Sequence, residues 1–244
     1  MNTPSSNQST PISVTILTKN SSRYIEACLS SVAGFDEVVI LDNGSTDNTL
    51  DIARDFANVK IFKSEFIGFG PLKNLAQTYA SHDWILSIDS DEVLTPELRQ
   101  AIKNTVLDKQ NIYGFNRLNH FKGKPVHCCG WDKDRVKRLY NKTRTQFDNA
   151  QVHESIQTQG LTPTIIRGNL LHYSYDSIEE IIDKLQKYST LWAEQNYQKK
   201  TSSMFKASYK SLFAFFFFFF LQKGILHVGV GLLISVCSAF GVFA

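Results

Sequence analysis

The sequence predicts an α/β domain with a parallel sheet, followed by an apolar helical extension. Between residues 12 and 95, apolar β-rich runs alternate with helical stretches, which is typical of a parallel sheet covered by helices. Residues 205–244 differ, because they contain 10 of the 18 phenylalanines and no Asp or Glu. A chain of 244 residues has room for one substantial domain with such an appendage.

Four strands are expected in the first part of the domain. They are Ile12–Leu17, Glu37–Leu41, Val59–Phe62 and Trp84–Ile88. The expected helices are Tyr24–Val32, a helix capped by Thr46 or Asp47 that continues to Phe56, a helix from Pro71 to about Ala80, and Pro96–Val106. Parallel sheets bind ligands at the carboxyl ends of their strands, so the residues that follow these strands are the first candidates for a site.

Less regular, β-rich segments are expected in the second part of the domain. They are Ile112–Leu118, Arg135–Tyr140 and Thr164–Tyr173. A helix over Ser177–Tyr197 follows, since its apolar residues recur at helical spacing. Within the basic stretch that begins at Lys133, strand alternation predicts that Arg138 lies on the opposite face from Arg135 and Lys137.

Two carboxylates separated by one residue, Asp89 and Asp91, come directly after the fourth predicted strand. Magnesium and manganese prefer oxygen ligands, and they commonly join one or two protein carboxylates to substrate phosphates. The pair therefore suits a metal-bound diphosphate. Taken alone, Asp-Ser-Asp also fits an ordinary surface turn, and Asp47 also fits a routine helix cap.

Four sequence blocks, taken together, favour a metal-bound diphosphate site over an ordinary surface turn. They are ISVTILTKN at 12–20, VVILDNGSTD at 38–47, GFGPLKN at 68–74 and DSDE at 89–92. In order and spacing, residues 12–95 resemble the inverting family 2 glycosyltransferases. The resemblance implies a GT-A fold, which is a Rossmann-like α/β fold that binds nucleotide sugars. It also implies a nucleotide-sugar donor and a divalent metal, Mg²⁺ or Mn²⁺, as cofactor.

The same resemblance assigns roles to individual residues. Thr18 and Asn20 would line the nucleoside pocket, and Asp42 would accept a hydrogen bond from the base, typically uracil. Lys73 would lie near the base or the phosphates. Asp89 would lie near the ribose and the metal, and Asp91 would bind the metal itself. Asn43 departs from the family, where many members carry a second Asp or a small residue, so its own role is in doubt.

Later blocks resemble a narrower group, the bacterial lipopolysaccharide core β-glucosyltransferases and related short membrane-associated enzymes. These blocks are RLY at 138–140, VHE at 152–154 and LHYSY at 171–175. The resemblance implies transfer of a hexose, glucose from UDP-glucose, onto a core sugar such as heptose of lipopolysaccharide or lipooligosaccharide. Two alternatives stay open: a sugar transferase acting on a polyprenyl phosphate, and a non-catalytic membrane protein that binds nucleotide sugars.

An inverting transfer to a hydroxyl needs a base that removes the hydroxyl proton. Glu154 is the preferred candidate, because relatives place their catalytic carboxylate in this half of the domain. The adjacent His153 is the alternative, and in a strand the two side chains would point in opposite directions. His172, at the end of a strand-like run, is a minority candidate for a third metal ligand.

These assignments divide the chain into a disordered N-terminal tail, 1–11, a GT-A domain, 12–198, and a membrane-associating tail, 199–244. Within the domain we expect a nucleotide-sugar-binding half at 12–95, an acceptor half at 96–175 and a closing helix at 177–197. The polar N-terminus lacks the features of an export signal. The four cysteines do not form a spaced disulfide framework, and His127 beside Cys128 and Cys129 lacks a second ligand pair for zinc, so a reducing cytosol is expected.

The net charge of +3 resides entirely in residues 205–244, since basic and acidic residues balance at 23 each in the rest of the chain. Such a small charge does not suggest nucleic acid as a partner. Leu212–Leu221 is only ten apolar residues, too short to span a bilayer, whereas Ile225–Ala244 is just long enough. Lysines flank both segments: Lys199, Lys200, Lys206, Lys210 and Lys223. We therefore expect an interfacial or shallow hairpin anchor at the cytoplasmic face of a bacterial inner membrane, beside a lipid-linked saccharide acceptor. A true span over 225–244 stays open as the alternative.

Overall fold

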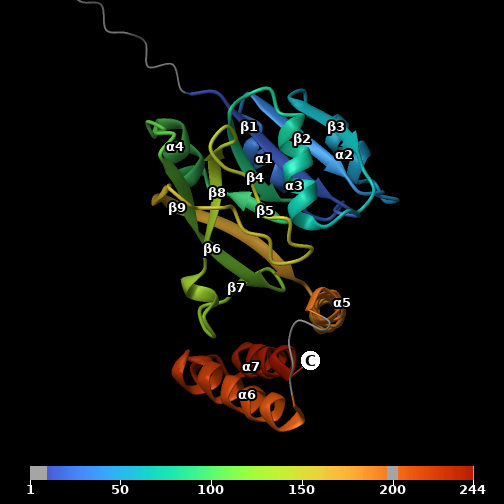
Figure 1. Cartoon of the computed structure of the whole chain (residues 1–244), viewed down its shortest axis with the longest axis vertical. Helices are drawn as coiled ribbons and strands as arrows, with labels where there is room; N and C mark the ends of the chain where they lie inside the picture. The colour runs from blue at the N-terminus through green and yellow to red at the C-terminus, as the bar shows by residue number, and fades with distance from the viewer. Residues whose placement is uncertain (1–9, 197–202, 244) are drawn as a thin grey trace, which may run out of the picture. The chain divides into compact units, whose positions relative to one another are not determined.

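The computed structural model of the chain describes residues 10–196 and 203–243 (Figure 1). The described residues form two compact units. The first contains the residues up to Asn116 together with Arg135–Leu170, and the second contains Arg117–Asp134 and the residues from Leu171 onward. Most of the predicted N-terminal tail, and both Lys199 and Lys200, lie outside the described residues. The predicted functional halves, 12–95 and 96–175, stay a prediction.

The first unit is built on the four predicted parallel strands. These are β1 (Ile12–Thr18), β2 (Glu37–Asp42), β3 (Val59–Lys63) and β4 (Trp84–Asp89). They lie side by side in the order β3-β2-β1-β4, and all their pairings are parallel. Each of these four strands is confirmed to within one residue, because each was a short apolar run bounded by polar residues.

The sheet continues from β4 in the order β8-β6-β9-β5. The three longer strands are β8 (Arg135–Asn141), β6 (Asn111–Phe121) and β9 (Thr162–Tyr175). Two short strands were not predicted, β5 (Glu92–Leu94) and β7 (Lys124–Pro125), because two or three residues are too few to show a periodicity. β8 runs antiparallel to β4, so the parallel sheet is extended by an antiparallel part.

The helices are those expected from the sequence, with shifted ends. They are α1 (Ile25–Val32), α2 (Thr49–Arg54), α3 (Phe69–Thr78), α4 (Pro96–Asn104) and α5 (Ile178–Asn196). α2 begins three residues after Thr46, because the carboxylate of Asp47 accepts a hydrogen bond from the amide of Thr49 and holds the preceding residues in a turn. α4 has the expected start, with Thr95 as a side-chain cap and Pro96 in the first turn.

The parallel strands are buried on both faces, as their near-continuous apolar runs predict. On one face, Val14, Ile40 and Leu86 pack with residues of α1 and α4 in the main hydrophobic cluster. On the other face, α3 contributes Leu72 and Ala76, which pack against Leu41. The strand ends are therefore held by helices on both sides.

A buried carboxylate fastens the other end of the same strands. Glu37, at the start of β2, is 4% exposed and accepts hydrogen bonds from Lys60 Nζ at 2.7 Å and from the amide of Ser81 at 2.7 Å. The hydroxyl of Ser13 donates to the same carboxylate. Burial raises the pKa of Glu37, but the bonds from Lys60, Ser13 and Ser81 outweigh it and lower the pKa from 4.5 to about 2.

Replacing Glu37 by Gln should therefore destabilise the protein by about 1–3 kcal/mol at pH 7, because the pairing with Lys60 is lost and a buried donor is left facing the Ser81 amide. The pKa of Glu37 is depressed in the folded state, so its contribution is present above pH 4.5 and is lost as the pH falls towards 2. Urea unfolding should show that the free energies of unfolding of wild type and Glu37→Gln differ at pH 7, and that this difference disappears as the pH falls through this range. Glu26→Gln, on the exposed face of α1, is the matched control, and an equal effect of both substitutions would contradict the account.

The C-terminal helices correct the predicted apolar segments. α6 (Met204–Phe216) runs on through a π-helical turn, Phe217–Leu221, so the Leu212–Leu221 run is part of an 18-residue helix that is long and apolar enough to cross a membrane by length and composition. A short 3₁₀ turn, Gly224–His227, delays the start of α7 (Val228–Phe243), and the apolar helix there is shorter than a span. The two helices pack against each other as a hairpin (Figure 1).

Candidate functional site

Three of the predicted site residues lie at the carboxyl ends of three neighbouring parallel strands. Thr18 of β1 is paired with Asp42 of β2, and Leu17 of β1 is paired with Asp89 of β4. The order β2-β1-β4 therefore brings the two predicted carboxylates to one edge of the sheet with Thr18 between them. This placement follows from parallel pairing, and it confirms that the loops after β2 and β4 open onto the same edge.

Asp42 is buried, and its own loop satisfies its carboxylate. The side chain is 1% exposed, and it accepts hydrogen bonds from the amides of Gly44 and Ser45 at 3.0 Å each. The hydroxyls of Thr18, at 3.1 Å, and Ser45 also donate to it. Burial raises the pKa of Asp42, but these bonds outweigh burial and hold the pKa below its usual value. A base that hydrogen-bonds to Asp42 would have to displace one of these four donors.

Hydrogen bonds also join the loops that follow β1, β2 and β4. Asn20 has a left-handed backbone, with φ of 51°, and its side-chain oxygen accepts from the amide of Thr46 at 2.8 Å. The amide of Asn20 donates in turn to the hydroxyl of Ser45 at 3.0 Å. Ser21 reaches the third loop, because its hydroxyl lies 2.8 Å from that of Ser90. The three loops form one connected surface above the strand ends.

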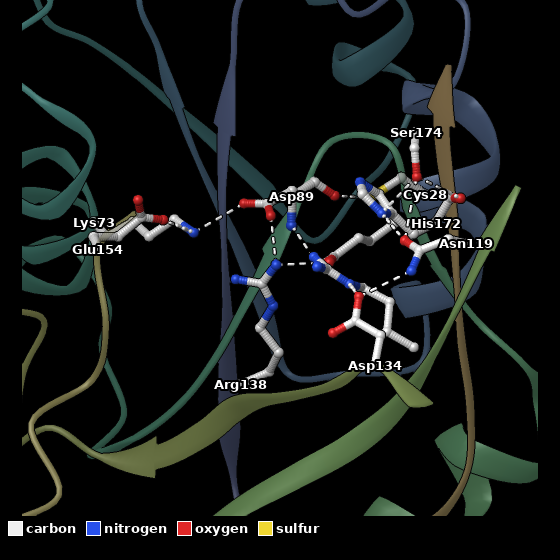
Figure 2. A network of polar contacts seen from close by, with 11 residues as sticks. Cys28, Lys73, Asp89, Asn119, Asp134, Arg138, Glu154, His172 and Ser174 are labelled. Atoms are coloured by element: carbon white, nitrogen blue, oxygen red, sulfur yellow. Dashed lines mark hydrogen bonds and ion pairs between the residues drawn. The ribbon is translucent and has the colours of Figure 1, made fainter. Parts of the chain in front are cut away.

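Lys73, on α3, connects the strand end to the predicted catalytic carboxylate. Its side chain is 3% exposed, and its Nζ lies 2.9 Å from Asp89 Oδ1 and 2.7 Å from Glu154 Oε1 (Figure 2). The ammonium also lies over the ring of Phe147, 5.1 Å from its centroid. A buried lysine with two carboxylate partners fixes the separation of those carboxylates. The structure thus brings together three residues that the sequence assigned to separate roles.

Arg138, on β8, holds the other side of Asp89. Its guanidinium pairs with Asp89 Oδ2 and, at 2.6 Å, with Glu92 Oε1 (Figure 2). Glu92 is fully buried, and its second oxygen accepts from the amide of Asp89 at 3.0 Å. Burial disfavours the charge on Arg138, but Asp89, Glu92 and Glu154 outweigh burial and raise its pKa. As predicted, Arg138 lies on the opposite face from the exposed Arg135.

The start of α3 positions the segment that carries Glu154. The amides of Phe69 and Gly70 donate to the carbonyls of Gln151 and Ala150, at 3.2 and 3.1 Å. Asn74 makes two further bonds to the backbone of Phe147, at 2.9 and 3.0 Å. The segment therefore lies against the first two turns of the helix that bears Lys73, and this contact explains how Glu154 reaches Lys73.

Gly70 is the position at which this contact is tightest. A Cβ there would lie 2.0 Å from the carbonyl oxygen of Asp148, which is backbone and cannot rotate away. Gly70→Ala should therefore displace the segment that carries Glu154, destabilise the protein by about 1–3 kcal/mol and lower kcat/KM about 10- to 100-fold. Gly229→Ala, where a Cβ meets nothing within 4 Å, is the control. Thermal unfolding measures the effect on stability, and a transfer assay measures the effect on kcat/KM. Wild-type stability and activity in Gly70→Ala would contradict this account of the contact.

The two histidine candidates are placed differently from Glu154. His153 is exposed and has a left-handed backbone, with φ of 59°, so the predicted strand alternation between His153 and Glu154 is wrong. His172 belongs to the second unit, where its Nδ1 lies 2.6 Å from Asn119 Oδ1 and 2.9 Å from Ser174 Oγ (Figure 2). Asn119 also donates to Asp134 at 2.9 Å. His172 thus belongs to a polar network of its own unit, and its role as a metal ligand stays a prediction.

The charges around Asp89 suit a divalent cation. Asp89, Glu92 and Glu154 supply three carboxylates against the two cations of Lys73 and Arg138. Asp91 acts on Cys28 together with Asp89 and Glu92, and it raises the formal excess to two negative charges. Among residues 10–196 and 203–243, no group of three or more His, Cys, Asp and Glu side chains is arranged to hold an ion. One or two carboxylates are enough for Mg²⁺ or Mn²⁺ when phosphates supply the remaining oxygens, so Asp91 with Asp89 fits such an ion.

Comparison with known proteins identifies the family. The profile of glycosyl transferase family 2 matches residues 13–162, more than half of the chain. The chain belongs to this family. An uncharacterized glycosyltransferase of Rickettsia prowazekii is 30% identical over 95% of the chain and 84% of its own length. The lipopolysaccharide core biosynthesis glycosyltransferase LpsC of Rhizobium meliloti is 27% identical over 90% of the chain and 84% of its own length.

The chain is also similar to solved structures. The structure of residues 1–349 of S. aureus TarS in complex with UDP matches 90% of this chain and 75% of its own, with 18% identity and a TM-score of 0.48. The longer TarS chain is matched over 44% of its length. The family match confirms the GT-A fold that the sequence blocks imply, and this family 2 glycosyltransferase has the expected α/β sheet and apolar helical extension.

Sequence reasoning missed two residues of the site in this family 2 glycosyltransferase. Arg138 appeared in a basic stretch and in the RLY block, and Glu92 appeared at the end of the DSDE block, but neither was given a role. The available signal was the alternation in β8, which placed one arginine on the buried face, where an arginine needs carboxylate partners. The partners themselves could not be inferred, because β8 pairs with β4 across more than 40 residues of sequence.

Proposed function

We propose that the protein is an inverting hexosyltransferase that moves glucose from UDP-glucose onto a core sugar of lipopolysaccharide or lipooligosaccharide. One observation carries the proposal. Lys73 contacts both Asp89, at the strand end where a donor would bind, and Glu154, the candidate base, at 2.9 and 2.7 Å. Family 2 membership and the likeness to LpsC support the reaction class.

Glu154 is the base in this proposal. Its carboxylate removes the proton of the acceptor hydroxyl as that oxygen attacks the anomeric carbon, which breaks the bond to the diphosphate and inverts the configuration. Lys73 fixes the carboxylate in place, so the base is oriented before the acceptor binds. Because Glu154 is 15% exposed while Lys73 is 3% exposed, the carboxylate is the accessible member of the pair.

Thr18, Asn20 and Asp42 form the nucleoside side of the site in this proposal. Their loops are already joined by hydrogen bonds, so little ordering is required when the donor binds. Asp91 and Asp89 hold the divalent metal, Mg²⁺ or Mn²⁺, and Arg138 with Glu92 supports Asp89. The bound metal supplies positive charge for the leaving nucleoside diphosphate.

The acceptor is a lipid-linked saccharide in this proposal, and the enzyme works at the cytoplasmic face of a bacterial inner membrane. The likeness to a lipopolysaccharide core glycosyltransferase supports the acceptor. The 18-residue apolar helix Met204–Leu221 supports membrane association.

Incubation of the purified protein with manganese, labelled UDP-glucose and a glycolipid extract tests the proposal. The expected result is label in the glycolipid that depends on the metal and is lost in Asp91→Asn. Donor binding without transfer or hydrolysis would overturn the enzymatic function and favour a non-catalytic nucleotide-sugar-binding protein. Label recovered only in polyprenyl phosphate would overturn the core-sugar acceptor.

A further inference from the structure

Each helix of the α6–α7 hairpin has a row of exposed apolar side chains. On α6 and its π-helical turn, Phe205, Tyr209, Phe213, Phe216 and Phe220 recur at helical spacing, and each is 49–85% exposed. On α7, Leu232, Val236, Phe240 and Phe243 do the same, and each is 41–53% exposed. We call these nine residues the apolar stripe. Exposed apolar stripes of this extent on a soluble chain mark an interaction surface.

The charges of the hairpin identify the kind of partner. Residues 203–243 contain Lys206, Lys210 and Lys223 and no Asp or Glu, and all three lysines are exposed. Two lysines lie in the first turns of α6, and the third lies in the bend. Lysines at the borders of an apolar surface are attracted to anionic lipid headgroups, whereas a protein partner would not require this composition.

The bend of the hairpin is fastened to another part of the same unit. The amide of Cys129 donates to the carbonyl of Gln222 at 2.7 Å, and its thiol contacts the carbonyl of Gly231 at 3.5 Å. Cys128, Cys129 and Ile234 form a buried cluster with Phe218 packed against it. A bend that the protein holds in this way is not free to be the tip of a segment that dips into a bilayer.

The open end of the hairpin is fastened as well. Near the end of α7, Gly241 packs closely against Leu185 of α5. The two are so close that a Cβ added to Gly241 would lie 3.1 Å from Leu185 Cδ2. The hairpin is therefore held by protein at its bend and at its open end. The apolar stripe runs along both helices between these two attachments, and Figure 1 shows the helices packed side by side.

The helix lengths agree with an in-plane position. After Lys210, the apolar part of the first helix is Ser211–Leu221, about 16 Å long at 1.5 Å per residue. α7 has 16 residues, or about 24 Å. Both lengths fall short of the roughly 30 Å of a hydrocarbon core, although the whole helix Met204–Leu221, with Lys206 and Lys210 included, is long enough to cross. A vertical hairpin with Lys210 at the membrane surface would also place Lys223 near the bilayer centre.

We infer that the α6–α7 hairpin lies flat in the headgroup region of a single anionic leaflet, with the apolar stripe inserted and the lysines at the lipid phosphates. This inference deepens the proposed function, because it rests on a lipid-linked acceptor and specifies how the enzyme is held beside it. A flat hairpin keeps the rest of its unit on the same side of the membrane as the acceptor headgroup.

Depth measurements test the orientation. Phe205→Trp, Phe213→Trp and Phe220→Trp, made singly, are mixed with vesicles that contain phosphatidylglycerol and phosphatidylcholine brominated at defined depths, and the signal of the parent protein is subtracted. A flat hairpin predicts the same shallow depth at all three positions. Depth that increases steadily from Phe205 to Phe220 would overturn the inference in favour of a crossing helix. Absence of quenching at every position would overturn it as well.

Vesicle sedimentation tests the lipid partner. Neutralising Lys206, Lys210 and Lys223 together by substitution with Gln should weaken binding to phosphatidylglycerol vesicles about 100-fold, since each such lysine contributes roughly fivefold. The control is a variant in which three exposed lysines of the first unit, Lys63, Lys109 and Lys137, are replaced by Gln. This variant should bind the vesicles about as well as wild type. A stable dimer that does not bind vesicles would overturn the inference, because the apolar stripe would then be an interface between two copies of the chain.

Transfer to a delipidated core oligosaccharide separates this inference from the proposed function. Variants that no longer bind vesicles should retain this activity, because their catalytic residues are unchanged. Vesicle binding without any sugar transfer would overturn the proposed function and leave the hairpin inference intact.

Discussion

Replacing Glu154 by Gln should lower the rate of sugar transfer by about 10²- to 10⁴-fold, because the amide cannot accept the proton of the acceptor hydroxyl. The affinity for the donor should stay within a few fold, since Asp42, Asp89 and Asp91 are retained. A radiolabel transfer assay gives the rate, and calorimetry with UDP gives the affinity. The separation of the two effects distinguishes a base from a residue that only shapes the pocket.

His153→Gln is the matched control, because His153 is the neighbouring residue and is exposed. It should leave the transfer rate within a few fold of wild type. A large loss in His153→Gln together with normal transfer in Glu154→Gln would reverse the assignment. Normal transfer in both variants would favour an acceptor that needs no base, such as a polyprenyl phosphate.

Replacing Arg138 by Met should have the largest effect on stability. The buried carboxylate of Glu92 would lose the cation of Arg138, and Asp89 would keep only Lys73; the loss of one partner from a buried pair costs about 3–5 kcal/mol. Transfer should fall as well, because Asp89 would lose one of the two cations that position it. Urea unfolding measures the first effect, and the transfer assay measures the second.

Arg135→Met is the control for this substitution, since Arg135 lies on the same strand with its side chain exposed. It should change the free energy of unfolding by less than about 0.5 kcal/mol. Arg138→Lys should recover part of the stability but not the full transfer rate. One guanidinium nitrogen, Nη2, contacts both Asp89 and Glu92, and the shorter lysine side chain would not place its ammonium at the same point. Equal stability of the Met and wild-type proteins would refute the role of this pair.

The parallel part of the fold was predictable because its signals are local. Each of β1 to β4 is a short apolar run bounded by polar residues, and parallel pairing then places Asp42 and Asp89 at one edge. The hairpin was less predictable. Apolar residues alone placed its first segment at Leu212–Leu221, whereas the helix extends back to Met204 through residues with polar side chains.

The site was predictable as a set of residues but not as a network. Resemblance to a family indicated Lys73, Asp89 and Glu154 separately. Their contacts depend on the packing of the segment that carries Glu154 against the start of α3, a contact between residues about 80 positions apart. No local pattern encodes that distance, and the same reason explains why Arg138 and Glu92 were missed.

The anomeric configuration of the product tests the central claim most directly. Proton NMR of a reaction that contains the purified protein, a divalent metal, UDP-glucose and a core oligosaccharide distinguishes α- from β-linked glucose. A single displacement assisted by Glu154 predicts a β-linked product, because the sugar in UDP-glucose is α-linked. An α-linked product, or a donor that stays intact with every acceptor tested, would contradict the account.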